Sequence, residues 1–191
     1  GAAVARGDLL LFVEEDVEAV DAAWLEEMAV LALREGVGAV EARLLSRDGT
    51  VVHGGTAFDA AGLPGSTFKG YPVDHPGYFS NLAGRRNVLA AGSACLMTRA
   101  EVFRAALGFD EKFPHGCFAE DYTLRLTEAG LRVVHTAKAS LLRDGDATPR
   151  RPGAPELRRF RDRWLGTVLA DPFFPAAFDR STLDFRLEER P

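Results

Sequence analysis

The sequence predicts an α/β domain in which helices flank a mixed, mainly parallel β-sheet. Two observations lead to this fold class. Residues 9–13 form a continuous apolar run, which is typical of a strand buried on both faces. Residues 21–34 carry apolar side chains at helical spacing, with Asp21 as a candidate N-cap and Gly36 as a helix end. With 191 residues, 47% of them hydrophobic, the chain is long enough to build one core.

The rest of the chain continues this alternation of strands and helices. We expect strands at residues 37–45, 51–58, 88–97 and 131–136, and helices at residues 98–107, 120–129 and 156–169. The Gly- and Pro-rich residues 59–86 are expected to form a long loop region. We therefore expect a core at residues 1–147 and a C-terminal part at residues 148–191. The C-terminal part consists of an Arg- and Pro-rich linker, a helix and a tail that pack on the core.

Composition and charge exclude several functions. A net charge of −5 argues against nucleic acid as a partner, because phosphate binding needs a basic face. No apolar run approaches the roughly 20 residues that span a bilayer. Cys95 and Cys117 lie in apolar surroundings and are expected to be free thiols of a reducing, cytoplasmic protein. No pair of the four histidines has close metal-ligand spacing, so a zinc site is not expected.

An acidic cluster, Glu14-Glu15-Asp16, directly follows the first apolar run. If this segment stays extended, Glu14 and Asp16 point to one side and Glu15 to the other. Two carboxylates at the carboxyl end of a strand suit a hard divalent cation, Mg²⁺ or Mn²⁺. The alternative is that these acids only solvate the strand end and favour the next helix's N-terminus.

A second pair of acids, Glu120 and Asp121, lies in the first turn of an expected helix. The helix dipole and the free N–H groups there keep a carboxylate ionised, which suits a general base. An ordinary acidic helix start is the competing interpretation. His53, followed by two glycines, either lines a ligand pocket or belongs to a structural turn.

Five motifs run in one order along residues 5–147. They are GDLLLFVEED at 7–16, GVGAV at 36–40 with DGTVVHGG at 48–55, RNVLAAGSACLM at 86–97, GFDE at 108–111 and FAEDYTLRL at 118–126. Each motif alone is weakly specific, but the ordered series resembles the family 2 glycosyltransferases of the GT-A fold, the fold of nucleotide-diphospho-sugar transferases.

This resemblance implies an inverting transfer of a sugar from a nucleotide-diphosphate donor to an acceptor hydroxyl. It implies a divalent metal, Mg²⁺ or Mn²⁺, on Glu14 and Asp16, with Asp121 as the catalytic base. The metal would stabilise the departing nucleoside diphosphate. The expected setting is cell-envelope polysaccharide synthesis in the cytoplasm, at the inner face of the membrane.

The acceptor site implied by the resemblance comprises Gly92, Ser93 and Glu120. His53 is assigned to the donor side. The acceptor is a saccharide or a lipid-linked molecule, and polysaccharide, glycolipid and protein acceptors all stay open. Arginines at residues 150–163 suit either peripheral contact with an anionic membrane or lipid phosphate, or a solvated face.

The chain departs from the family pattern at three places. Glu14 replaces the usual Asp, and Thr123 replaces the second acid of the helix motif. Residues 139–146 contain no His where the family often has a metal ligand. We expect Arg143 to contact the diphosphate directly, or Asp144 to act as a ligand.

These departures favour one alternative, a catalytically degenerate carbohydrate- or nucleotide-binding module of the same fold. A nucleotidyltransferase with a similar α/β architecture is a third reading. The family's nucleotide-binding half would precede residue 1, so we expect a partial domain with little transferase activity in isolation.

Overall fold

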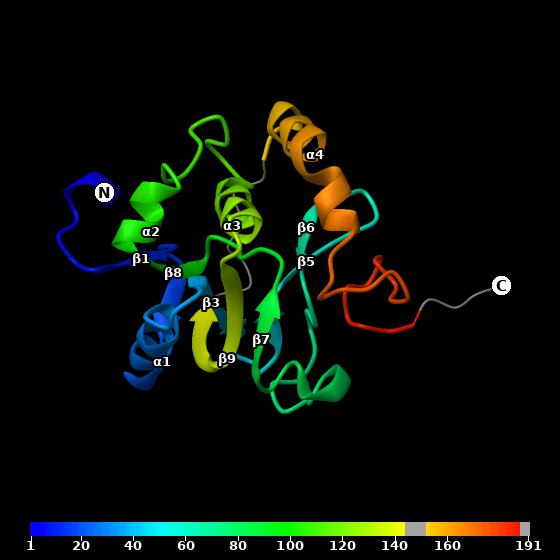
Figure 1. The fold of residues 1–191 in the computed structure, drawn as a ribbon. Helices are drawn as coiled ribbons and strands as arrows, with labels where there is room; N and C mark the ends of the chain where they lie inside the picture. Colours follow the sequence, from blue (N-terminus) through cyan, green and yellow to red (C-terminus); the bar gives the residue numbers. More distant parts are fainter. Residues whose placement is uncertain (144–151, 188–191) are drawn as a thin grey trace.

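The computed structural model describes residues 1–143 and 152–187, and it confirms an α/β fold. The described elements, in chain order, are η1 (Ala2–Val4), β1 (Leu9–Val13), β2 (Val17–Ala19), α1 (Ala23–Ala32), β3 (Val37–Leu45), β4 (Val51–His53), β5 (Thr56–Phe58), β6 (Pro64–Ser66), η2 (Tyr78–Ser80), β7 (Arg85–Val88), β8 (Cys95–Arg99), α2 (Ala100–Ala105), α3 (Phe118–Glu128), β9 (Arg132–Arg143) and α4 (Ala154–Leu169). Figure 1 shows these helices arranged around the main sheet.

The main sheet has seven described strands in the order β1-β8-β3-β9-β2, with β4 paired to β3 and β7 paired to β9. Only β3 and β9 run parallel, whereas the other described pairings of this sheet are antiparallel. The sheet is therefore mixed, as predicted, but the prediction that it is mainly parallel is wrong. A continuous apolar strand signals burial on both faces and does not encode the direction of its neighbours.

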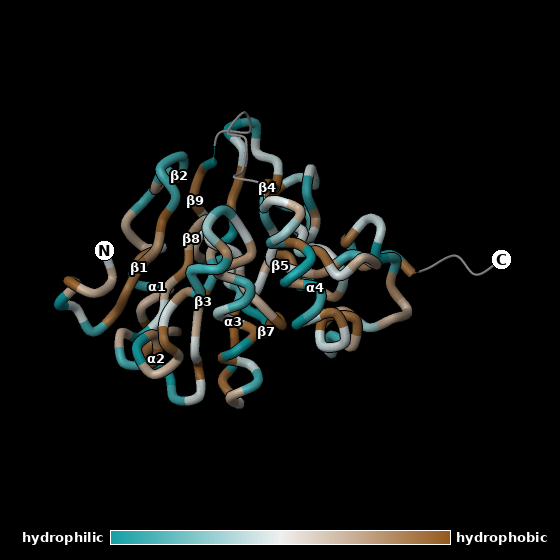
Figure 2. The backbone as a smooth tube through the Cα atoms, turned by 90° about the horizontal axis from the view of Figure 1, so that it is seen from above, coloured by the Kyte–Doolittle hydropathy of each residue, from teal (hydrophilic) through white to brown (hydrophobic). Residues whose placement is uncertain are grey.

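Helices cover both faces of this sheet. On one face, Met28 and Leu31 of α1 pack in a cluster with Val40 of β3. On the other face, Tyr122 of α3 packs in a cluster with Leu96 of β8. Seen from above, the hydrophobic stretches lie along the strands and the turns are largely hydrophilic (Figure 2). Burial on both sides explains why these strands lack a polar–apolar alternation.

The helix expected at residues 156–169 is present as α4, and it packs against the core with the tail that follows. Phe160 and Trp164 of α4 join a buried cluster with Phe58 and Leu124. Tail phenylalanines join a second cluster around Phe68. The division of the chain at residue 147 stays a prediction, because residues 144–151 lie outside the described ranges.

Two expected strands are split by glycine-containing breaks. Residues 51–58 form β4 and β5, which belong to different sheets, and Gly55 between them has φ +111. Residues 88–97 contain only the end of β7 and the start of β8, with Gly92 in the irregular segment between them. At these breaks the backbone leaves the sheet and exposes N–H groups that can bind side chains.

Thr98 and Glu101 have the three-residue spacing of a capping box, but no capping box forms. Helix α2 begins at Ala100, with Arg99 as N-cap and no side-chain cap. The Thr98 hydroxyl instead donates to the carbonyl oxygen of Gly38 at 2.7 Å. Thr98 therefore ties β8 to β3, and α2 lacks the cap that its sequence suggested.

The main sheet is strongly curled. Strands β1 and β2 stand at opposite ends of the strand order, yet only residues 14–16 connect them. Register shifts in the β3–β9 pairing, one of them at Ala42–Arg43, accompany this curvature. The acidic cluster thus crosses the edge of the sheet at which β1 ends. Within the described ranges, no helix has the length and apolar character needed to cross a membrane.

Candidate functional site

A cleft of about 1330 Å³ opens beside the carboxyl end of β1. Its volume is larger than that of a typical small-molecule pocket, which is about 300–1,000 Å³. It is lined by seven of the site residues expected from the sequence, and Asp121 is not among them: Glu14, Asp16, His53, Gly92, Ser93, Glu120 and Arg143. The fold therefore gathers positions that are spread over most of the chain.

Glu14 and Asp16 meet at the guanidinium of Arg143. Arg143 Nε donates to Asp16 Oδ2 at 2.8 Å, and Arg143 Nη2 donates to Glu14 Oε2 at 2.5 Å. A turn, closed by the Val17 N–H to the Glu14 carbonyl at 3.1 Å, brings the two acids together, so the segment is not extended as expected. Pairing of Val17 with Arg143 in β2–β9 sets the position of the guanidinium. Glu15 is exposed at the cleft margin.

The carboxylates of Glu14 and Asp16 have the chemistry that a hard cation requires, since their ligand atoms are all oxygen. Asp16 Oδ1 is buried and has no hydrogen-bond partner among the described residues, so one ligand position is unsatisfied. Arg143 holds one oxygen of each carboxylate. The pair therefore fits a divalent cation once Arg143 releases it, because two positive charges cannot share the same oxygens favourably. Asp144, the alternative ligand, lies outside the described residues.

The segment Gly92-Ser93 connects the acidic turn with the inner wall of the cleft. The Ser93 hydroxyl donates to Glu14 Oε1 at 2.5 Å. The Gly92 N–H donates to Glu41 Oε2 at 3.0 Å. A Cβ on Gly92 would stand 3.8 Å from Glu120 Oε1, so this segment also borders the start of α3. One irregular segment thus donates hydrogen bonds to two carboxylates and borders a third.

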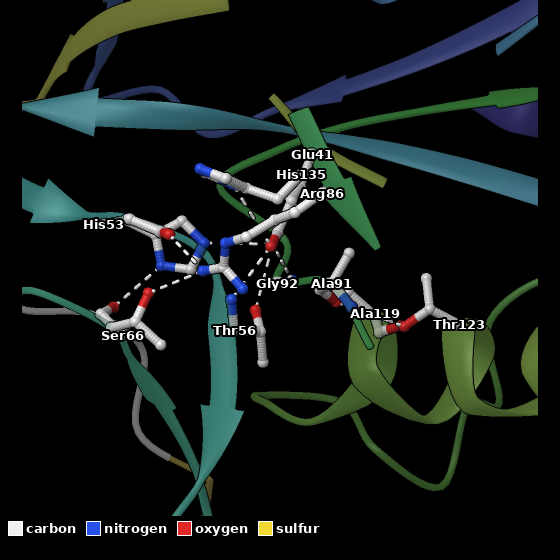
Figure 3. Close-up of polar contacts among 12 residues, drawn as sticks. Glu41, His53, Thr56, Ser66, Arg86, Ala91, Gly92, Ala119, Thr123 and His135 are labelled. Atoms are coloured by element: carbon white, nitrogen blue, oxygen red, sulfur yellow. Dashed lines mark hydrogen bonds and ion pairs between the residues drawn. The ribbon is translucent and has the colours of Figure 1, made fainter. Parts of the chain in front are cut away.

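Glu41 is the centre of a polar network on the inner wall, and it was not among the site residues expected from the sequence. Its carboxylate accepts the N–H and the hydroxyl of Thr56, each at 3.0 Å (Figure 3). His53 Nε2 lies 3.0 Å from Glu41 Oε2, and His53 Nδ1 lies 2.9 Å from the Ser66 hydroxyl. Burial opposes ionisation of Glu41, but the electrostatic interaction with His53, the His53 hydrogen bond and the close approach of His135 hold the pKa of Glu41 well below the ordinary value. Glu41 therefore stays ionised.

His135 lies behind Glu41 on β9 and is fully buried. Its Nδ1 is 3.5 Å from Glu41 Oε1, and neither ring nitrogen has a hydrogen-bond partner among the described residues. Burial lowers the pKa of His135 to about 4, and the nearby charge of Arg86 adds to this. The ring is therefore neutral at neutral pH. Glu41, His53 and His135 together could hold a metal ion.

Glu120 reaches the cleft from the first turn of α3. Burial raises its pKa to about 7, and the negative charges of Glu41 and Glu14 add to the shift. A carboxylate that titrates near neutral pH is suited to accept a proton from a substrate.

Asp121 does not line the cleft. Its fully buried carboxylate accepts hydrogen bonds from Arg125 Nε at 3.0 Å, Arg163 Nη1 at 3.1 Å and Trp164 Nε1 at 2.9 Å. These donors come from α3 itself and from α4, so Asp121 joins the two helices. Its role as a base stays a prediction from the resemblance, and the cleft-facing acid of the pair is Glu120.

Thr123, which stands where the family pattern has an acid, supports the irregular segment before Gly92. Its hydroxyl accepts the Ala91 N–H at 2.9 Å and donates to the Ala119 carbonyl at 2.8 Å (Figure 3). Because the group both donates and accepts, a carboxylate could not replace it without losing one contact. Thr123 therefore fixes the backbone that carries Gly92.

Fold and cleft together define an α/β protein with an acid-lined site of ligand size. No protein-family model matches the chain. It is 36% identical over 195 residues to the O-antigen biosynthesis protein RfbC of Myxococcus xanthus. The aligned region covers 98% of this chain and 15% of RfbC. It is also 37% identical over 181 residues to the uncharacterized protein y4gI of Sinorhizobium fredii (strain NBRC 101917 / NGR234). That aligned region covers 90% of this chain and 20% of y4gI. The chain thus spans a fifth or less of these relatives.

Proposed function

We propose that this chain carries the metal and acceptor part of a glycosyltransferase for cell-envelope polysaccharide, which moves a sugar from a nucleotide-diphosphate donor to an acceptor hydroxyl with inversion. One observation carries the proposal: Glu14, Asp16, Arg143, Ser93 and Glu120 line a single cleft. The similarity to a protein named for O-antigen biosynthesis supports a polysaccharide as the product class.

The donor diphosphate is assigned to the mouth of the cleft, where Glu14, Asp16 and Arg143 meet. A divalent cation held by Glu14 and Asp16 supplies positive charge that stabilises a departing nucleoside diphosphate. When the donor arrives, Arg143 exchanges its two carboxylate partners for diphosphate oxygens, which its planar fork matches well. The exchange keeps every charge in the site paired.

Glu120 is assigned as the general base that takes the proton of the acceptor hydroxyl. As this carboxylate takes the proton, the acceptor oxygen attacks the anomeric carbon. The bond from that carbon to the diphosphate breaks, and the nucleoside diphosphate leaves with the electron pair. Attack from the face opposite the leaving group inverts the configuration. The pKa of about 7 places Glu120 where a general base is most effective at neutral pH.

The inner wall positions the acceptor beside Glu120. Gly92 leaves this side of the cleft open, and Ser93 offers a hydroxyl to the hydroxyls of the sugar. A saccharide or a lipid-linked saccharide fits this chemistry. Arg158 and Arg161 are exposed on α4 and suit the phosphate of a lipid-linked acceptor at a membrane surface.

Equilibrium binding of uridine and guanosine diphosphate sugars to the full-length protein tests the donor site. With Mn²⁺ present, we expect Glu14→Gln and Asp16→Asn to weaken binding at least tenfold, and the exposed neighbour Glu15→Gln to leave it near wild type. Metal-independent binding, or equal affinity in all three variants, contradicts the donor assignment.

The second candidate is a binding module without turnover. The two ion pairs of Arg143 favour it, because they occupy the carboxylates that a catalytic metal needs. This candidate predicts donor or saccharide binding with no release of nucleoside diphosphate, whatever the metal.

A further inference from the structure

We propose that Glu41, His53 and His135 form a binding site for a transition-metal ion of the zinc class on the inner wall of the cleft, separate from the acidic turn. One ligand atom from each residue lies within 4.8 Å of the others. The three residues stand on β3, β4 and β9, which pair side by side in the main sheet. The site is therefore built on rigid strands, which suits a preformed metal site.

The kind of ion follows from the ligand atoms. Two imidazole nitrogens and one carboxylate oxygen suit zinc and similar ions, whereas magnesium and manganese prefer oxygen ligands alone. Three protein ligands leave a fourth tetrahedral position open. Glu41 and His53 line the cleft, so this position is reachable from the cleft while His135 closes the site from behind.

The distances agree with a shared ion. Atoms bound at about 2.0–2.1 Å to a tetrahedral zinc stand about 3.3–3.4 Å apart. His53 Nε2 lies 3.0 Å from Glu41 Oε2, and His135 Nδ1 lies 3.5 Å from Glu41 Oε1. Small side-chain adjustments would bring both separations to the zinc value.

His135 gives independent support. A neutral imidazole carries one donor and one acceptor nitrogen, and buried polar groups are normally satisfied. His135 is fully buried, and both of its nitrogens lack a hydrogen-bond partner among the described residues. One nitrogen points toward Glu41 (Figure 3). An ion bound there would satisfy this nitrogen and neutralise the excess negative charge of Glu41.

Groups around the three ligands already orient them, as outer groups do in known metal sites. Thr56 and the Gly92 N–H fix the Glu41 carboxylate. Ser66 pairs with His53 Nδ1, which directs Nε2 toward Glu41. If Nδ1 carries the proton, Nε2 presents a lone pair to the carboxylate, and a cation between the two removes their repulsion.

One neighbouring charge opposes the ion. A Cβ on Gly55 would clash with Arg86 Nη2 and would lie 3.2 Å from the His135 ring, so Arg86 and His135 flank the same glycine. The guanidinium donates to the Gly54 carbonyl at 2.7 Å and to the Thr67 hydroxyl at 3.0 Å, which holds it in place. We therefore expect weaker binding than at a site without a neighbouring cation.

The test uses tag-free, full-length protein stripped of metal by a chelator. Calorimetric titration with Zn²⁺ is expected to give one equivalent per chain, and Co²⁺ is expected to give the visible absorption of a tetrahedral site. His53→Gln and His135→Gln should each weaken Zn²⁺ binding at least tenfold. The exposed His75→Gln is the matched control and should bind as wild type does.

Two further measurements keep the outcome decisive. Circular dichroism establishes that each variant is folded before titration, and Zn²⁺ should raise the Tm of wild type but not of His53→Gln. Asp16→Asn should keep Zn²⁺ binding, which separates this site from the donor site. Absence of stoichiometric Zn²⁺ binding to wild type, or wild-type affinity in both His53→Gln and His135→Gln, overturns the proposal.

Discussion

Glu120 and Asp121 are neighbours at the start of α3, yet their carboxylates lie in different environments. Glu120 lines the cleft, whereas Asp121 is fully buried and accepts hydrogen bonds from Arg163 and Trp164 of α4. Successive helical residues project about 100° apart, so adjacent acids can serve different neighbours. One acid is available to a substrate and the other joins two helices.

Asp121→Asn is expected to destabilise the fold. The new amide turns one acceptor into a donor, so it leaves a buried guanidinium contact unpaired. Removing one partner of a buried ion pair typically costs about 3–5 kcal/mol, and we expect the lower end because Arg163 is 41% exposed. Urea unfolding monitored by circular dichroism measures the change.

The exposed Glu128→Gln, on the same helix, is the matched control for Asp121→Asn. It should change the free energy of unfolding by less than about 0.5 kcal/mol. If both substitutions have equally small effects, Asp121 does not join α3 to α4 in solution.

The rate of sugar transfer is expected to depend on pH through Glu120. A base acts only when deprotonated, so kcat/KM should rise with pH and level off above about 7, the pKa of Glu120. Because burial raises this pKa from the usual value, the rising limb should lie well above pH 4.5. A pH profile without a limb near 7 argues that another group takes the proton.

Arg143→Gln is expected to strengthen the binding of Mn²⁺ and to weaken the binding of the donor. Without the guanidinium, Glu14 and Asp16 lose their competing partner, so the Mn²⁺ concentration for half-maximal binding should fall severalfold. The KM for the donor should rise, because a contact to the diphosphate is lost. Arg132→Gln, at the other end of β9, is the control and should alter neither value. A weaker Mn²⁺ response in Arg143→Gln would be incompatible with the exchange of partners.

Thr123→Val is expected to loosen the segment that carries Gly92. The substitution keeps the shape but leaves the buried Ala91 N–H without its partner, which costs about 1–3 kcal/mol. Thr123→Asp, which restores the family pattern, should destabilise at least as much, since a carboxylate cannot donate to the Ala119 carbonyl. Thermal unfolding measures both changes. A variant with aspartate that is more stable than wild type would show that the threonine is not adapted to this position.

The sequence predicted the elements with clear periodicity or apolar runs. The expected 37–45 strand matches β3, and the expected 156–169 helix lies within α4. The directions of the strands could not be predicted, because an apolar run such as β1 reports burial on both faces and is compatible with antiparallel neighbours. The long loop region also concealed the short strand β6, whose three residues carry no periodic signal.

The sequence predicted only some of the residues of the candidate site. Ordered motifs located the acidic turn and the start of α3, but motif order does not state which of two adjacent acids faces a cleft. Glu41 was missed although it carries a readable signal: with Arg43 it is one of two ionisable residues in the mostly apolar strand β3, and such residues are rarely buried without partners. His53 and His135 are far apart in sequence, so spacing rules for metal ligands could not connect them.

The release of nucleoside diphosphate from a nucleotide-diphosphate sugar by the full-length protein, in the presence of acceptor, tests the central assignment most directly. Glu120→Gln should lower kcat by roughly 10²–10⁴-fold while donor affinity stays near wild type. Asp121→Asn, assayed below its Tm, should retain most of the wild-type rate. A wild-type rate in Glu120→Gln, with the loss of turnover in a folded Asp121→Asn, would contradict the account and return the base to Asp121.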